Sequence, residues 1–199
     1  MIQVHVSVKP AGGSKLDKQV TFATALALTQ TAKDAQGAVI GDIESTFTVR
    51  NNWDKPSNKF GIRITPATKD HLTSVVRTDA DWLNLHEEGG IKIPEGHFIA
   101  IPTSNVRRTK KQIVQKGQRP KALFGKRDFL ILTKKNRRPV LFQRFGRGKR
   151  SDIKARYVLV PRGQIKREST VFDPVQKTVE RVFGQNFSKA LQRAIATAK

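Results

Sequence analysis

Residues 173–197 read DPVQKTVERVFGQNFSKALQRAIAT, which is the clearest helical pattern in the chain. Asp173 suits an N-cap, and Pro174 suits the first helical position. Apolar residues then recur at helical spacing, namely Val175, Val179, Val182, Phe183, Phe187, Ala190, Leu191, Ala194 and Ile195. This stripe predicts an amphipathic C-terminal helix over about residues 174–197, with one face packed on the rest of the protein.

A longer helix is predicted near the N-terminus, over about residues 16–46. Its apolar stripe consists of Leu28, Ala32, Ala35, Val39 and Ile43. The steps between these residues are three or four, as on one face of a helix. Many inward positions are Ala, so we expect another element to pack closely against this face. Ala32, Ala35 and Val39 are therefore candidates for packing between subunits.

Short strands are predicted outside the two helices. Residues 2–8 alternate apolar and polar side chains, which is typical of a half-buried strand. Similar patterns occur at residues 60–64, 71–76, 91–93, 98–101 and 155–160, and residues 129–132 and 140–145 give a hairpin signal. The prediction is a single α+β domain over residues 1–199, in which a mostly antiparallel sheet of short strands is packed by the two helices.

Composition excludes several classes of chemistry. The chain has 199 residues and no Cys, which excludes disulfides, Cys-ligated zinc, iron–sulfur clusters and thiol nucleophiles. It also lacks the P-loop, GxGxxG, GxSxG and HExxH motifs, which weighs against common cofactor-dependent and hydrolase classes. No apolar stretch approaches the ~20 residues that span a bilayer, and the N-terminus does not read as a signal peptide. We expect a soluble protein without cofactor, assembled inside a cell.

Charge is distributed very unevenly along the chain. The 38 basic and 16 acidic residues give a net charge of +22. Residues 107–167 contain 22 basic and 2 acidic residues, whereas residues 1–106 are neutral. Three interpretations of the basic segment stay open: a solvated surface, phosphate contacts with nucleic acid, and docking on an acidic protein.

The candidate contact residues fall in two basic stretches. Residues 103–127 have few large apolar residues and no clear period, so we predict an extended basic arm or loop. Its candidates for contact with DNA or a partner are Arg107, Arg108, Lys110, Lys111, Lys116, Arg119 and Lys121. A second basic loop carries Arg147, Lys149 and Arg150. The aromatic residues of this region, from Phe124 to Tyr157, mostly fall at strand positions and are expected in the core rather than as base-stacking platforms.

The acidic cluster of the chain consists of Asp79, Asp81, Glu87 and Glu88. Paired carboxylates can act as a general acid and base, and His86 and His97 could join Glu87 and Glu88 in a metal site. Acids favoured near a helix N-terminus explain Asp79 and Asp81 more simply, and the spacing of the other residues matches no metal-ligand pattern. We therefore predict no catalytic residue, no metal and no enzyme activity. A nuclease working on a basic platform is a third alternative.

A series of short motifs runs along most of the chain. ALTQTAKDA (27–35) lies in the first helix, which is followed by FTVRN (47–51) and ITPATK (64–69). WLNLHEEGG (82–90), VLFQRFGR (140–147) and YVLV (157–160) come next, ahead of the amphipathic C-terminal helix. In its order and spacing this layout resembles the tail-completion, or minor tail protein Z-like, proteins of long-tailed bacteriophages.

The resemblance implies a structural virion protein without catalysis, which sits at the head–tail junction. Such a protein completes the tail or neck as part of a ring, expected to be a hexamer, that joins the head connector to the tail tube. The implied partners are further copies of the chain, neighbouring neck, connector, terminator or tail-tube proteins, and genomic DNA in the channel, with no membrane. We expect it in the virion, after assembly in the host bacterial cytoplasm. The alternative is a sequence-independent RNA- or DNA-binding protein that uses residues 107–167.

Overall fold

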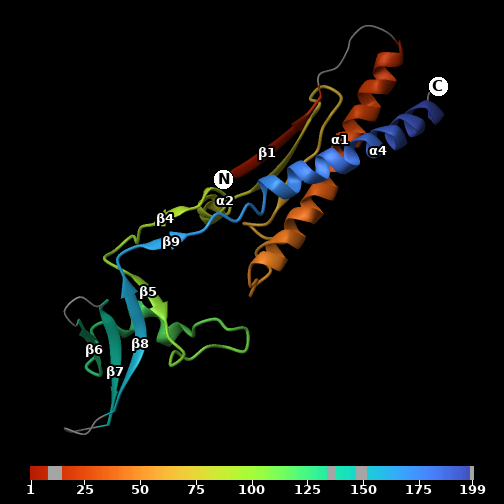
Figure 1. Cartoon of the computed structure of the whole chain (residues 1–199). Helices are drawn as coiled ribbons and strands as arrows, with labels where there is room; N and C mark the ends of the chain where they lie inside the picture. Colours follow the sequence, from red (N-terminus) through yellow and green to blue (C-terminus); the bar gives the residue numbers. More distant parts are fainter. Residues whose placement is uncertain (9–14, 134–137, 147–151, 198–199) are drawn as a thin grey trace. The chain divides into compact units, whose positions relative to one another are not determined.

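The computed structural model describes residues 1–8, 15–133, 138–146 and 152–197 (Figure 1). Two long helices and short antiparallel strands confirm the predicted α+β class. Tertiary contacts gather in two compact units, which are described separately. Unit 1 comprises Met1–Gly90 and Lys166–Lys199, and unit 2 comprises Ile91–Ile165. The prediction of one domain over residues 1–199 stays a prediction.

Unit 1 combines two long helices with a three-stranded antiparallel sheet. The helices are α1 (Lys15–Thr46) and α4 (Phe172–Ala196), as predicted. The sheet has the order β1-β3-β2 and consists of β1 (Ile2–Ser7), β2 (Arg63–Thr65) and β3 (Thr73–Thr78). A short 3-10 helix, η1 (Asp81–Leu83), leads into α2 (Asn84–Glu88). The predicted strands at residues 2–8 and 71–76 are therefore confirmed as β1 and β3.

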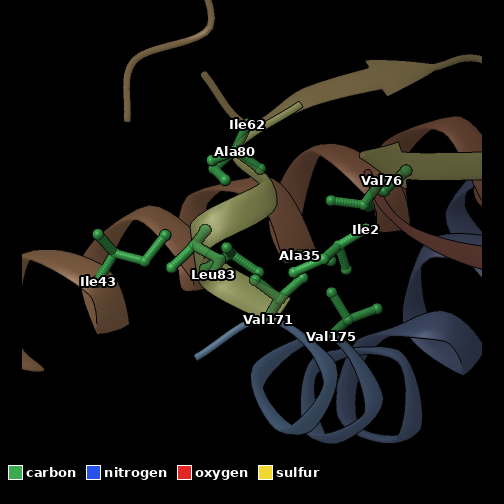
Figure 2. Packing of buried hydrophobic residues seen from close by; sticks show 11 residues of the cluster. Ile2, Ala35, Ile43, Ile62, Val76, Ala80, Leu83, Val171 and Val175 are labelled. Carbon is green, nitrogen blue, oxygen red and sulfur yellow. The ribbon is translucent and has the colours of Figure 1, made fainter. Parts of the chain in front are cut away.

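The core of unit 1 forms where α1, the start of α4, the sheet and η1 meet. Figure 2 shows Ala35 and Ile43 of α1 directed toward Leu83 and Val175 in this cluster. Ala32, Ala35 and Val39 are completely buried within the chain's own core. The prediction that these three residues pack between subunits is therefore wrong, because none of their surface is left exposed to a second chain.

Alanine lets α1 and α4 approach each other closely, and the two helices lie side by side in Figure 1. Ala23 and Ala27 of α1 share a buried cluster with Ala190 and Ala194 of α4. The distance between packed helices depends on the size of the side chains at the contact, so small residues allow a short one. The close packing expected along the Ala-rich face is thus made by the chain's own C-terminal helix.

Unit 2 is built on a four-stranded antiparallel sheet with the order β5-β8-β7-β6. Its strands are β5 (Ile99–Pro102), β6 (Phe129–Leu132), β7 (Val140–Phe145) and β8 (Asp152–Val160). The predicted hairpin is confirmed by the pairing of β6 with β7, in which Ile131 lies opposite Leu141. A two-stranded ribbon is formed by β4 (Gly90–Lys92) and β9 (Gly163–Ile165), and the second of these strands was not predicted.

Candidate functional site

The positive charge of the chain is concentrated in unit 2. Residues 91–165 contain 21 basic and 3 acidic residues, so this unit carries a net charge of +18 and the rest of the chain carries +4. Within the described part of the chain, every salt bridge lies in unit 1. A small folded unit with so large a positive charge attracts acidic partners and repels other basic surfaces.

The loop between β5 and β6, residues 103–127, is called the basic loop below. Its first half is a narrow hairpin in which Arg108 and Val114 form a β-bridge. The Thr109 N–H donates to the Ile113 carbonyl at 2.8 Å, which closes the turn. Lys110 and Lys111 therefore lie at the tip of the hairpin, and both are exposed.

The second half of the basic loop folds onto the sheet. It contains the 3-10 helix η2 (Lys116–Gln118) and the short helix α3 (Pro120–Leu123), whose first residue is a proline, as helix starts favour. Val106 and Leu123 are 3% and 2% exposed and pack in one cluster with Leu141 of β7. The stretch predicted as an arm or loop is thus a loop with two short helices and two buried apolar anchors.

Strand β8 supplies further anchors for the basic loop. The Thr103 N–H donates to the Arg156 carbonyl at 2.9 Å, and the Arg156 guanidinium donates to the Asn105 carbonyl. The Tyr157 hydroxyl donates to the Gln118 carbonyl at 2.7 Å. Burial raises the pKa of Tyr157, so the phenol keeps the proton that this hydrogen bond requires. Burial also lowers the pKa of Arg156, with the nearby charge of Arg107 as a second cause.

Seven of the ten predicted contact residues lie on this one loop, and all seven are exposed. Arg107, Arg108, Lys110 and Lys111 belong to the hairpin, Lys116 begins η2, Arg119 precedes α3 and Lys121 lies within it. Arg147, Lys149 and Arg150 lie outside the described residues. The structure therefore gathers the first group of candidates on a single anchored segment.

An apolar groove opens on unit 2 beside α3. It has a volume of about 640 Å³ and is lined by Gly96, His97, Phe98, Ala100, Pro120, Phe124, Ile131 and Leu159. Ala100 of β5 and Leu159 of β8 are paired neighbours in the sheet. Phe124 was expected in the core but is 46% exposed. Sequence reasoning missed the groove because its lining comes from segments that are far apart in the chain.

Glu87 of the acidic cluster is buried and has a structural role. The backbone N–H groups of Thr170 and Val171 donate to its Oε1 at 2.7 and 2.8 Å. The N–H of Phe172 donates to Oε2 at 3.2 Å, and the hydroxyls of Ser169 and Thr170 also donate to this carboxylate. Glu87 therefore caps the N-terminus of α4.

The other acidic residues singled out in the sequence lie in a helix turn or in ion pairs. Asp173, predicted as the N-cap of the C-terminal helix, lies instead in its first turn. Asp79 pairs with Arg63, and Asp81 pairs with the N-terminal ammonium group of Met1. Among the described residues, no three His, Asp or Glu side chains are grouped so that they could hold a metal ion.

Comparison with known proteins gives no relative for this chain. No family model matches it, and neither a curated protein nor a solved structure matches it. In the part of the chain that the structure describes, no helix combines the length and the apolar character needed to cross a membrane.

Proposed function

We propose that the protein is a structural, non-catalytic component of a long-tailed phage particle that completes the tail or neck. Several copies, six in the expected arrangement, form a ring that joins the head connector to the tail tube. The observation that carries the proposal is the charge of unit 2, a net +18 on a small folded unit with an exposed, anchored basic loop. The motif order that resembles tail-completion proteins supports the same role.

The excess positive charge of the chain favours assembly with partners of opposite charge. Six copies bring together a net charge of +132, six times that of one chain. Like charges at this density repel unless a partner neutralises them. Acidic neck, connector or tail-tube proteins, and DNA in the channel, supply the opposite charge. The ring is therefore expected to form together with its neighbours in the virion.

The basic loop is suited to be the contact surface because it is folded in the isolated chain. It is held near its start by the Asn105 carbonyl and in its second half by the Gln118 carbonyl, which accept hydrogen bonds from Arg156 and Tyr157 of β8. A segment held in place loses less conformational entropy on binding than a free one. The hairpin with Lys110 and Lys111 is thus presented to a neighbour in a defined position.

The acidic cluster supports a role without catalysis. Asp79 and Asp81 are taken up by ion pairs with Arg63 and the N-terminus, and Glu87 caps α4. These contacts give the three carboxylates structural partners within unit 1. The proposal assigns no cofactor and no metal to the chain.

A charge-reversal experiment tests the role of the basic loop. Arg107→Glu with Arg108→Glu is introduced into the phage that carries the gene, and particles and infectious titre are compared with the parent. A matched control reverses Arg181 and Lys189, two exposed cations of α4 in unit 1. We expect heads and tails that fail to join only with the loop variant, while circular dichroism shows both variants folded. Normal particles from the loop variant would refute the contact role.

Sequence-independent binding to RNA or DNA is a second candidate function, favoured by the exposed lysines at the hairpin tip. It predicts that the isolated chain binds duplex DNA with an affinity that falls steeply with salt, by a log–log slope of about −0.9 per phosphate contact. Two results together would select this candidate. The parent chain would bind DNA in this way and the Arg107→Glu/Arg108→Glu variant would not, while the phage with that variant would still assemble normal particles.

A further inference from the structure

The apolar groove of unit 2 exposes large apolar side chains that share one surface. Phe98, Phe124 and Ile131 are 44%, 46% and 49% exposed, yet all three line the groove. Leu159, by contrast, is 1% exposed. Scattered apolar residues on a surface need no explanation, but a concave group of them marks a binding site.

The size and lining of the groove restrict what can occupy it. Its volume of about 640 Å³ lies within the ~300–1,000 Å³ of typical ligand sites. Apart from the ring of His97, the side chains that line it are hydrocarbon. Burial of a polar group against hydrocarbon costs free energy unless a hydrogen bond compensates it. The occupant therefore presents large aliphatic or aromatic side chains to the groove.

The segment of the groove around α3 is cationic, whereas the segment with Gly96 and His97 follows the exposed Glu95. Pro120 lies between Arg119 and Lys121 in the chain, and Phe124 is followed closely by Lys126; these three basic side chains are exposed. The acidic residues of the whole unit are Glu95, Asp128 and Asp152. An occupant with carboxylates next to its apolar side chains gains attraction that a neutral or basic occupant does not.

We propose that this groove binds an acidic protein segment in which Asp and Glu residues flank one or two large apolar side chains. The apolar side chains contact Ala100, Ile131 and Leu159, and the carboxylates lie near the cations around α3. Such a segment would belong to a protein that neighbours the basic loop. Where that neighbour sits in a particle rests on the proposed function.

Nucleic acid fits the groove less well, although it also carries negative charge. Phe98 and Phe124 could stack on bases, but base edges are polar, and Ala100, Ile131 and Leu159 offer them no hydrogen-bonding side chain. A second copy of unit 2 is disfavoured because both partners would carry +18. An acidic segment with apolar side chains satisfies both the lining and the charge.

Binding of defined peptides to the full chain tests the inference. The probe is a short fluorescent peptide with a central Leu-Phe pair flanked by Asp and Glu, and its binding is measured by fluorescence anisotropy. The matched peptide keeps every carboxylate but has Ser-Ser in place of Leu-Phe. We expect the serine peptide to bind at least about tenfold more weakly, because the groove recognises the apolar pair. Equal binding of both peptides would overturn the inference.

Two neighbouring residues of β6 provide matched protein variants. Ile131 lines the groove, whereas Leu132 is 41% exposed and, as the next residue of the strand, points to the opposite face. Ile131→Ser is expected to weaken binding of the Leu-Phe peptide about tenfold, and Leu132→Ser to leave it within about twofold. Phe124→Ser, outside the strands, gives a second test should Ile131→Ser fail to fold. Unchanged binding by Phe124→Ser and by a folded Ile131→Ser would overturn the inference.

The outcomes separate this inference from the proposed function and from nucleic-acid binding. A duplex oligonucleotide that binds more tightly than the peptide and loses affinity with Ile131→Ser would overturn it in favour of nucleic acid. Failure of the peptide experiment, with particles that still require Arg107 and Arg108, would remove the groove inference alone. Groove-dependent peptide binding, with normal particles in a phage lacking the gene, would remove the proposed function alone.

Discussion

Replacement of Glu87 by Ala is expected to destabilise unit 1 strongly, because this carboxylate is the cap of α4. The variant removes the acceptor for three backbone N–H groups. Thr170 and Val171 are each 1% exposed, so water cannot easily replace the carboxylate there. A buried donor left without a partner costs about 1–3 kcal/mol. Two such donors set the expected loss of unfolding free energy at about 2–6 kcal/mol. Phe172 is 44% exposed, so water can replace the carboxylate at its amide, and this third donor adds no cost.

Two further variants separate the loss of the buried acceptor from the loss of a negative charge. Glu87→Gln keeps one oxygen that can accept from Thr170 and Val171, but it directs an NH2 group at the Phe172 N–H. Its expected cost is smaller, about 1–2 kcal/mol. Glu88→Ala removes the adjacent, exposed carboxylate and is expected to change stability by no more than about 0.5 kcal/mol.

Urea unfolding followed by far-ultraviolet circular dichroism is the appropriate assay, because α1 and α4 both belong to unit 1 and dominate the helical signal. The expected order of stability is parent and Glu88→Ala, then Glu87→Gln, then Glu87→Ala. A Glu87→Ala protein as stable as Glu88→Ala would refute the capping role.

Three smaller predictions concern the packing of the helices and the anchor of the basic loop. Ala27→Leu overfills the seam between α1 and α4 and should cost about 1–3 kcal/mol in thermal unfolding; an unchanged melting temperature would contradict the close packing. Tyr157→Phe removes the hydrogen bond to the Gln118 carbonyl, so amide exchange in the basic loop should become faster and stability should fall by about 1 kcal/mol. Burial raises the pKa of Tyr157 above its usual 10.0, so the unfolded chain loses this proton first and parent stability should fall as pH rises above about 10. Because the chain has a single tyrosine, its titration can be followed by ultraviolet absorbance, and Tyr157→Phe should abolish this pH dependence; a Tyr157 that titrates normally would contradict it.

The two long helices could be predicted because their signals are local. The apolar stripes of α1 and α4 repeat at the period of one helix face, and this period does not depend on what the face packs against. Strands β1, β3, β6 and β7 were also predicted, since alternation and turn residues mark them within a few residues. The three-residue β9 was missed because Ile165 is its one apolar residue, and the flanking Arg162 and Lys166 extend no alternating pattern.

Which helices and strands pack against each other was harder to predict than where each of them lies in the sequence. The alanines of α1 correctly indicated a close neighbour, but a stripe of buried residues does not say which element covers it. The structure places α4 of the same chain against Ala23 and Ala27. For this reason Ala32, Ala35 and Val39 were assigned to a subunit interface although they lie in the core of unit 1.

The candidate site was predicted in its charge but not in its shape. The basic residues of the loop are exposed, as their composition indicated. The groove depends on β5, β6, β8 and α3 coming together, so no local pattern could reveal it. Glu87 likewise meets Thr170 and Val171 across more than eighty positions of the chain, and an acidic residue near a Gly-Gly turn carries no sign of such a contact.

Electron microscopy of particles from infected cells tests the central claim most directly, with the phage that carries the gene compared with the same phage lacking it. The account predicts full heads and finished tail tubes that do not join in the absence of the gene, and density for this protein at the head–tail junction in its presence. Joined, complete particles from the phage without the gene would contradict the account.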